Sequence, residues 1–307
     1  MKARSVSFDG IMEFVETART GSFTAAAVIL GMTNSAVGKS VSRLEARLGV
    51  KLLHRTTRRL TLTMEGAAYL ENCTNIVDQL ESVENALATG KDSPSGQLRL
   101  DLPGAFGRQN ILPILTSLAN QHPRLDFSVI FSERKADIIT ESVDLAVRIG
   151  ALDNHTEFSA RKLGTQRLVV CASPDYLRRT GVPLSPDDLV SRDCIAGWRS
   201  SGHPLWLFKS PDDNSSYAIE IQARHQFSDG GAMVRAVLDG CGLCQLPTWL
   251  VGEYLTSGEL MTVLDQYAGA EMPIHAIWPR SRYLQPKLRV LIDALVEAGR
   301  SQPAFNP

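Results

Sequence analysis

The most constraining stretch of this chain is residues 22–49, SFTAAAVILGMTNSAVGKSVSRLEARLG. Ser22 can cap a first helix that ends before Gly31, because a serine oxygen accepts a free backbone N–H at a helix start. Thr33 can cap a second helix in the same way. The second helix ends before Gly49, since glycine readily adopts the left-handed conformation that closes helices. Only a few residues join the two helices, so the stretch predicts a helix-turn-helix.

The second predicted helix has two chemically different faces. Apolar residues at spacings of four, three and four form a stripe that we expect to pack on the first helix. They are Val37, Val41, Leu44 and Leu48. The opposite face is small, polar and basic, at about 100° per residue. It holds Ser35, Lys39, Ser42 and Ala46, flanked by Gly38 and Arg43. Such a helix can lie deep in a DNA groove, where Ser35, Lys39 and Ser42 reach base edges and phosphates. A solvated face on an ordinary three-helix domain is the alternative.

Two flanking segments complete an amino-terminal domain over residues 6–63. Residues 8–20 predict a helix with four apolar side chains inward, and these are Ile11, Phe14, Val15 and Ala18. Residues 50–63, VKLLHRTTRRLTLT, are rich in β-branched residues and predict a two-stranded wing with a basic tip. Residues 1–65 carry a net charge of +5 in a chain whose net charge is −1, so we expect this wing to follow a phosphate backbone. A basic surface hairpin without a partner is the alternative.

Residues 64–90 predict a single long helix with Thr63 as its cap and Gly90 as its stop. Apolar side chains recur along it every 3.5 residues on average, which is the repeat of a coiled-coil seam. They are Tyr69, Cys73, Ile76, Leu80, Val83 and Leu87. A narrow seam on so long a helix favours dimerisation, and the alternative is a core helix of the second domain. A dimer would present two recognition helices to the half-sites of a partly palindromic DNA.

Residues throughout this region match, in register, the amino-terminal domain of LysR-type transcriptional regulators, which are bacterial winged-helix repressors and activators. The matching residues are Phe14, Ser22, Phe23, Thr24, Ala26, Ala27, Ala36, Val37, Leu44, Glu45, Leu48, Gly49, Leu52, Leu53, Arg55, Leu62, Thr63 and Gly66. More loosely, the resemblance covers nearly the whole chain. One residue departs from the pattern, because the family commonly has a serine where this chain has Gly38. That departure weakens base readout there or leaves it to Lys39.

The resemblance and the exposed helix face together define an expected DNA-contacting set. It comprises Thr33, Asn34, Ser35, Gly38, Lys39, Ser42 and Arg43 on the helix, and Arg55, Thr56, Arg58 and Arg59 in the wing. The resemblance also makes residues 64–90 the linker helix of the family. It implies a homodimer or a homotetramer built from two dimers. RNA polymerase is a further candidate partner.

Beyond a predicted hinge at residues 91–96, KDSPSG, the pattern changes to strands that alternate with helices. This alternation predicts an α/β domain over residues 97–300, with a mostly parallel sheet covered on both faces. Residues 108–121 predict a helix kinked at Pro113, and residues 217–228 predict one strand.

The second domain resembles the two-lobed fold of periplasmic solute-binding proteins, which is also the effector domain of LysR-type regulators. We expect one lobe over about 97–164 and 269–300, and the other over 165–268. The expected fold is therefore an all-α winged helix-turn-helix domain with a long linker helix, followed by a periplasmic-binding-protein-like α/β domain.

Four loops are candidates for an effector site, because ligands of open α/β sheets bind beyond strand ends and at helix starts. Their candidate residues are Gly104, Ala105, Phe106, Gly107, Arg148, Gly150, Trp198, Arg199, Asp229 and Gly230. Arg148 or Arg199 could pair a carboxylate, so we expect a small anionic metabolite. The alternative is that these loops are plain connections with structural arginines.

Other functions find little support in the sequence. No apolar run resembles a signal peptide or a membrane span, so we expect a cytoplasmic protein without a membrane partner. Cys241 and Cys244 have redox-like spacing but lack further ligands and begin a strand, so we expect small buried cysteines, with no metal or cofactor. An enzyme on the α/β domain and a DNA architectural protein are the rival hypotheses. Because no catalytic motif is present, the sequence favours a ligand-responsive, sequence-specific regulator of transcription.

Overall fold

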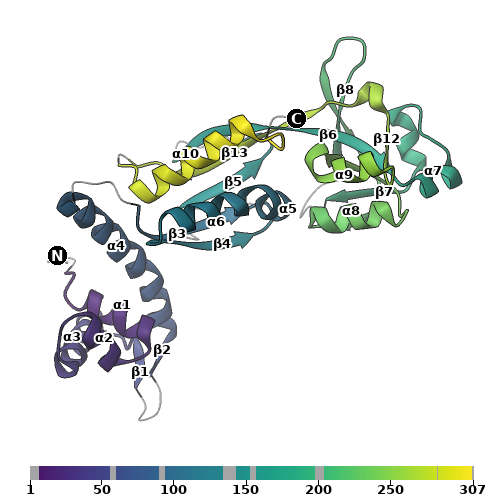
Figure 1. Ribbon diagram of the computed structural model, residues 1–307. Helices are drawn as coiled ribbons and strands as arrows, with labels where there is room; N and C mark the ends of the chain where they lie inside the picture. Colours follow the sequence, from purple (N-terminus) through teal and green to yellow (C-terminus); the bar gives the residue numbers. More distant parts are fainter. Residues whose placement is uncertain are drawn as a thin grey trace. The chain divides into compact units, whose positions relative to one another are not determined.

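The computed structural model describes the chain over residues 7–55, 60–89, 94–133, 143–152, 157–197, 204–281 and 283–305. For residues 55, 71, 75, 78, 79 and 81–89 it describes the backbone alone. The chain divides into two compact units, Met1–Asp92 and Ser93–Pro307, which are described separately below as unit 1 and unit 2 (Figure 1).

Unit 1 is built from short helices, a two-stranded hairpin and one long helix. The bounds are α1 Ile11–Thr20, α2 Phe23–Ile29, α3 Asn34–Leu48, β1 Leu53–Arg55, β2 Leu60–Leu62 and α4 Met64–Thr89. The predicted caps are confirmed: Ser22 Oγ accepts the Ala25 N–H at 3.3 Å. Thr33 Oγ1 likewise accepts the Ala36 N–H at 3.2 Å. Gly49 then ends α3 in the left-handed conformation, with φ at 74°.

The first helix differs from its prediction at one end. It begins at Ile11 rather than at residue 8, because Gly10 stands before it with a left-handed φ of 83° that a helix cannot include. Ala18 is only half-buried, and Thr17 instead lies in the core.

The core of unit 1 joins α1, α3, the hairpin and the first half of α4. Its buried residues are Ile11, Phe14, Val15, Val41, Leu44, Leu52, Leu53, Cys73 and Val77. The predicted stripe on α3 is confirmed for its first three residues but wrong for Leu48, which is 38% exposed. Leu48 is the last residue of α3, and the chain changes direction at Gly49. The Leu48 side chain therefore lies at the edge of the core.

Unit 2 is organised on one nine-stranded sheet with the order β10-β7-β11-β6-β13-β5-β3-β4, and β12 also pairs with β6. The strands are β3 Gly96–Leu102, β4 Leu125–Phe131, β5 Leu145–Ile149, β6 Phe158–Ala172, β7 Cys194–Gly197, β10 Ala223–Phe227, β11 Leu243–Pro247, β12 Met261–Val263 and β13 Glu271–Pro279. A separate hairpin pairs β8 Leu205–Lys209 with β9 Ser216–Glu220. The predicted strand over residues 217–228 is therefore two strands that belong to different sheets.

The prediction of a mostly parallel sheet is wrong, because the sheet is mixed. Its two ends are parallel, where β3 pairs with β4 and β5, and where β7 pairs with β10 and β11. Its middle is antiparallel, where β6 pairs with β11, β12 and β13, and β13 pairs with β5. The reason is that β6 and β13 carry the chain between the two ends of the sheet in opposite directions (Figure 1).

Separate hydrophobic cores lie on the two sides of this crossing and define two lobes. Leu163 and Ile274 belong to the core of lobe I, which α5 Gly104–Phe106, α6 Leu112–Gln121 and α10 Pro286–Ser301 help to build. Val170 and Leu264 belong to lobe II. The helices of lobe II are α7 Pro174–Thr180, η2 Pro186–Ser191, α8 Gly230–Leu238, α9 Thr248–Ser257 and η3 Asp265–Tyr267. β6 therefore begins in one lobe and ends in the other.

Where the sequence predicts a helix kinked at Pro113, the structure has a π-helical segment just before that proline. A π-helical segment, Gly107–Ile111, follows α5 and leads directly into α6, in whose first turn Pro113 stands. Proline has no N–H to donate to the preceding turn, and a π-bulge is a common way for a helix to accommodate such a break.

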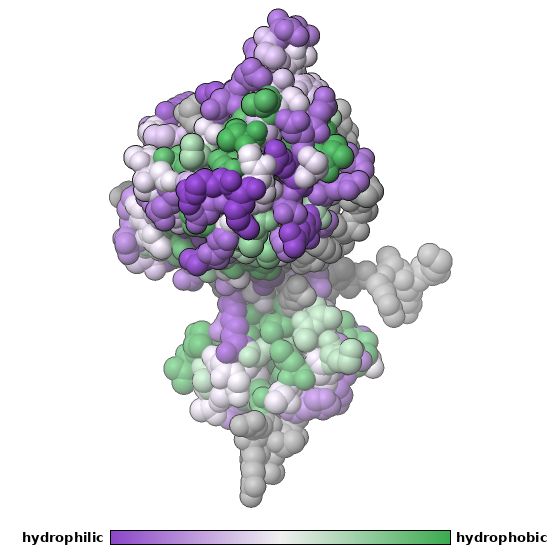
Figure 2. Space-filling model, turned by 90° about the vertical axis from the view of Figure 1, so that its right-hand side faces the viewer, coloured by the Kyte–Doolittle hydropathy of each residue, from purple (hydrophilic) through white to green (hydrophobic). Residues whose placement is uncertain are grey.

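On the side of the molecule drawn in Figure 2, hydrophobic residues form separate groups between hydrophilic ones. Among the helices that the structure describes, none has both the length and the apolarity to span a bilayer.

Candidate functional site

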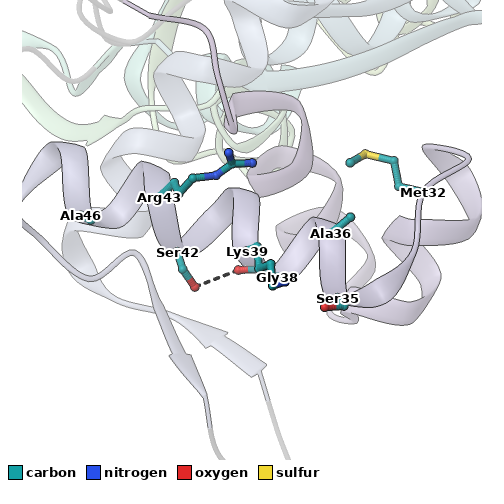
Figure 3. Close-up of a pocket in the computed structure, with 8 residues that line it drawn as sticks. All are labelled: Met32, Ser35, Ala36, Gly38, Lys39, Ser42, Arg43 and Ala46. Atoms are coloured by element: carbon teal, nitrogen blue, oxygen red, sulfur yellow. Dashed lines mark hydrogen bonds between the residues drawn. The ribbon is translucent and has the colours of Figure 1, made fainter.

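The exposed face of α3 is the first part of the candidate site. Ser35, Lys39, Ser42, Arg43 and Ala46 are exposed along it. Together with Met32, Ala36 and Gly38 they line an open hollow on one side of the helix (Figure 3). The Ser42 hydroxyl donates to the Gly38 carbonyl at 2.8 Å. The absence of a side chain at Gly38 keeps the hollow open, since an added Cβ there would meet nothing within 4 Å.

Residues at the start of α3 are tied to the helix before it. Thr33 caps α3, and the exposed Asn34 amide donates to Thr24 Oγ1 on α2 at 3.0 Å. The structure thus brings the seven helix residues of the expected DNA-contacting set to one end and one face of α3.

The inner face of α3 fixes this surface in place. Val37 and Val41 are fully buried, and Ser40 donates to Glu13 Oε1 on α1 at 2.8 Å. These contacts leave α3 little freedom to rotate, so its exposed face is presented in one orientation.

Glu45, which matches the family pattern but belongs to neither the apolar stripe nor the expected DNA-contacting set, is buried on α3 with 2% of its side chain exposed. Its Oε1 accepts the backbone N–H groups of Leu52 and Leu53 at 2.9 and 3.2 Å, and its Oε2 accepts Lys51 Nζ at 3.0 Å. Burial alone would raise the pKa of this carboxyl, but the hydrogen bonds and the lysine charge outweigh it and lower the pKa below 4.5. The charged carboxylate therefore stabilises unit 1 at any pH above the ordinary pKa of a glutamate. This contribution is lost as the pH falls through the lowered pKa of the folded state.

The hairpin that follows matches the predicted wing in its strands. β1 and β2 are antiparallel, with Leu53 opposite Leu62. Of the predicted contact residues, Arg55 is described by its backbone alone, and Thr56, Arg58 and Arg59 lie outside the described residues. After the hairpin, Thr63 Oγ1 accepts the Gly66 N–H at 2.8 Å and so caps α4, as predicted.

The predicted dimer seam on α4 divides into two parts. Cys73 is 3% exposed in the core of unit 1, and the Tyr69 ring packs on Phe14 with centroids 5.7 Å apart. These two residues face their own domain, which corrects their assignment to the seam. Ile76 and Leu80 are 46% and 51% exposed. The side chains of Val83 and Leu87 lie outside the described residues.

The second part of the candidate site lies where the two lobes of unit 2 meet. Three charged groups converge on Gly104, at the start of α5. A Cβ added there would lie 3.1 Å from Glu133 Oε1, 3.4 Å from Asp229 Oδ2 and 3.5 Å from Arg108 Nη1. The Gly104 N–H donates to Glu133 Oε1 at 2.8 Å.

Two contacts join the lobes at this point. Arg108 of lobe I pairs with Asp229 of lobe II, whose other oxygen accepts the Ala232 N–H at 3.0 Å and caps α8. A Cβ added at Gly230 would lie 3.1 Å from Ala105 Cβ, so α5 and α8 approach each other closely. Ala105, Asp229 and Gly230, three of the predicted effector residues, thus lie together.

Burial raises the pKa of Glu133, and the neighbouring Asp229 carboxylate raises it further, against the lowering effects of the Gly104 N–H and Arg108. Asp229 has the opposite shift: burial acts to raise its pKa, but the hydrogen bond and charge of Arg108 lower it. The charge of the Arg108 guanidinium therefore acts to lower the pKa of both carboxylates. Neither Arg108 nor Glu133 was predicted, because only the tertiary fold brings them to Gly104.

Three residues predicted for the effector site have structural roles instead. Arg148 is paired with the buried Asp101, 2.6 Å away, and only 14% of its side chain is exposed. Phe106 is buried between Trp249 and Phe305, with ring centroids 5.2 and 5.1 Å away. A Cβ on Gly107 would lie 2.7 Å from Leu102 Cβ, so that glycine permits close packing inside lobe I.

The remaining predicted effector residues are Gly150, Trp198 and Arg199. Gly150 is left-handed, with φ at 108°, and a Cβ added there would meet Met272 Cε at 3.4 Å. Trp198 and Arg199 lie outside the described residues.

The cysteines carry no sign of redox or metal chemistry in the described part of the chain, where every cysteine is free and no cluster of metal-binding side chains occurs. Burial raises the pKa of Cys171 and of Cys194 to about 12, and that of Cys244 well above its ordinary value. The prediction of a buried thiol is confirmed for Cys244, whereas Cys241 is half-buried.

We expect a thiol reagent at pH 8 to modify Cys241 first in the native protein, because a thiol reacts as its thiolate and needs access to the reagent. Cys171, Cys194 and Cys244 should react only after unfolding. Mass spectrometry of peptides after timed labelling measures this order. Labelling of Cys244 as fast as Cys241 would contradict the buried placement.

Comparison with known proteins finds a family match for each of the two units. Residues 9–67 match the model of the bacterial regulatory helix-turn-helix proteins of the lysR family, and residues 91–300 match the LysR substrate binding domain. An HTH-type transcriptional regulator of Xanthomonas campestris pv. campestris is 36% identical over 92% of this chain and 83% of its own length. The HTH-type transcriptional regulator CrgA of Neisseria meningitidis is 34% identical over 92% of this chain and 94% of its own.

A solved structure of CrgA, a LysR-type transcriptional regulator from Neisseria meningitidis, superposes with a TM-score of 0.59 at 31% identity, over 96% of this chain and 99% of that one. The two-unit architecture is therefore shared along the whole length. The chain belongs to the LysR family of transcriptional regulators, with a helix-turn-helix domain and a substrate-binding domain, and it is not an enzyme.

Proposed function

We propose that this regulator binds partly palindromic operator DNA as a dimer or a pair of dimers. In each copy α3 lies in the major groove, the wing follows the phosphate backbone, and RNA polymerase at the adjacent promoter is the target of regulation. The observation that carries the proposal is the face of α3, where every exposed side chain in the hollow is small, polar or basic apart from Met32. A backbone can approach bases closely over such a face. Binding selection from random duplexes, followed by footprinting at about 150 mM salt, tests it.

We propose that two copies dimerise through α4. The contact is the face of α4 that does not pack on the core of unit 1. Ile76 and Leu80 are separated by four residues and lie on one face of the helix. Two large apolar side chains exposed on one face of a helix are better accounted for by a second copy than by solvent.

Replacing Leu80 with glutamate should raise the dissociation constant of the dimer at least about a hundredfold, because it removes about 1.5–3 kcal/mol of apolar burial from each copy. Sedimentation equilibrium of the full chain measures the change. Met64→Glu is the matched control, since Met64 is 88% exposed on the same helix but outside the seam. If Leu80→Glu and Met64→Glu dimerise equally well, α4 is not the dimer contact.

We further propose that a small anionic effector binds beside Gly104, between the lobes, and regulates DNA binding. Arg108 is the cation that supports this, because its side chain is 49% exposed at the junction, whereas Arg148 is committed to Asp101. An anion that pairs with Arg108 competes with Asp229 for the same guanidinium. Effector binding would thereby change the contact between the lobes.

Replacing Arg108 with glutamine should weaken effector binding about tenfold to a hundredfold, the effect of losing one charge-assisted hydrogen bond worth about 1.5–3 kcal/mol. Calorimetric titration with a panel of carboxylate metabolites measures the affinity. The melting temperature of Arg108→Gln should equal that of the wild type. Arg148→Gln should instead lower the stability of unit 2 by about 1–3 kcal/mol, because it leaves the buried Asp101 carboxylate without its cation. Wild-type affinity in Arg108→Gln for every carboxylate that binds would exclude this site.

A further inference from the structure

Glu45 occupies an unusual place on α3, the helix that carries the proposed DNA face. It follows Ser42 by three residues and precedes Ala46, both of which are exposed in the hollow, yet its own side chain is 2% exposed. Burying a carboxylate in a small domain is costly unless hydrogen bonds replace its lost hydration. The hydrogen-bond partners of this carboxylate therefore indicate why the chain has a glutamate at position 45.

Three hydrogen bonds join Glu45 to three successive residues of one segment. They come from Lys51 Nζ and from the N–H groups of Leu52 and Leu53, at 3.0, 2.9 and 3.2 Å. Leu53 is the first residue of β1, and β1 leads directly into the tip of the wing. One carboxylate thus bonds the recognition helix to the root of the wing.

Hydrophobic packing alone would hold these elements together less specifically. Leu52 and Leu53 are buried in the same core as Leu44, and apolar contacts of this kind are not directional. A bidentate set of hydrogen bonds fixes both the direction and the register of β1 relative to α3. An apolar residue at position 45 would also leave two buried N–H groups without their acceptor. Each unsatisfied N–H group would lower the stability of unit 1.

We infer that Glu45 is a positioning residue for DNA recognition, which holds the wing in register with α3 so that both reach one duplex together. This inference rests on the proposed DNA-binding mode. It predicts that removing the Glu45 carboxylate uncouples the wing from the groove-binding helix, beyond any decrease in the amount of folded protein.

The test compares two duplexes carrying the operator found by binding selection, one with and one without the flanking base pairs that the wing would cover. In the wild type, removing the flanks should weaken binding about tenfold and lower the salt slope by about one for each phosphate that the wing no longer reaches. In Glu45→Met, which removes both acceptor oxygens at a similar side-chain length, the two duplexes should bind within about twofold of each other. Glu45→Gln, whose amide oxygen can still accept the Leu52 and Leu53 N–H groups, should keep most of the flank effect. Amide exchange of the peptide spanning residues 50–55 should rise in Glu45→Met.

Ser40→Ala is the matched control, because it removes a different buried hydrogen bond of α3, the one to Glu13 on α1. It should keep the full flank effect even where it lowers stability. If Glu45→Met keeps the flank effect, or loses affinity for both duplexes by the same factor, Glu45 is a structural residue only and the inference fails. A wild type that prefers no sequence at all would instead overturn the proposed function.

Discussion

Replacing Lys39 with glutamate should weaken operator binding about a thousandfold while both units stay folded. Lys39 is exposed on the face of α3 that lines the hollow, so its side chain makes no contribution to the core. Removing a side chain that bonds a base edge or phosphate costs about 1–3 kcal/mol, and a dimer pays this cost in both copies. At about 2 kcal/mol in each copy, the total corresponds to about three orders of magnitude in affinity.

Fluorescence anisotropy with the selected operator measures this decrease. Arg19→Glu is the control, because it makes the same change of charge in the same unit, on α1 rather than on α3. Its effect should be limited to long-range charge, within about tenfold and decreasing at higher salt. Equal decreases in the two variants would mean that α3 does not read the DNA.

Replacing Gly66 with alanine should lower the stability of unit 1 by at least about 3 kcal/mol, the upper end of ordinary overpacking. A Cβ at this position would lie 1.9 Å from the Leu52 carbonyl oxygen, which is backbone and cannot rotate away. The first turn of α4 would have to separate from the segment that Glu45 holds. Chemical unfolding followed by amide exchange of unit 1 peptides measures the change.

Gly38→Ala is the control for this second prediction. Its added Cβ meets nothing within 4 Å, and alanine is a better helix former than glycine by about 1 kcal/mol. It should therefore leave unit 1 as stable or more stable, and any decrease in DNA affinity would come from the altered hollow. If Gly66→Ala melts like the wild type, the packing of α4 against Leu52 is not as described.

Local signals in the sequence predicted unit 1 well. The bounds of α2 and α3 follow from residues that act within one turn, namely the caps at Ser22 and Thr33 and the left-handed Gly49. Periodicity identified the buried valines of α3 because they repeat within the helix itself. It failed at Leu48 and could not indicate Glu45, since the surroundings of both depend on where the chain goes after Gly49.

Unit 2 shows the same limit on a larger scale. The strand segments could be recognised individually, but strand direction cannot be read from periodicity, and β6 and β13 made the middle of the sheet antiparallel. Two arginines of lobe I also have different partners in the fold. Arg148 pairs inside lobe I with Asp101, whereas Arg108 crosses to Asp229. Only the pairing of distant strands decides which of them faces the other lobe.

The most direct test of this mode of DNA recognition is how binding depends on the distance between half-sites. Two copies joined through α4 should protect two major-groove segments on one side of the duplex, a whole number of turns apart. Inserting about half a helical turn, about 5 base pairs, between the half-sites should abolish the paired protection. A full turn should restore it at least in part. Equal binding to all three duplexes, or to a single half-site alone, would contradict recognition by a paired dimer.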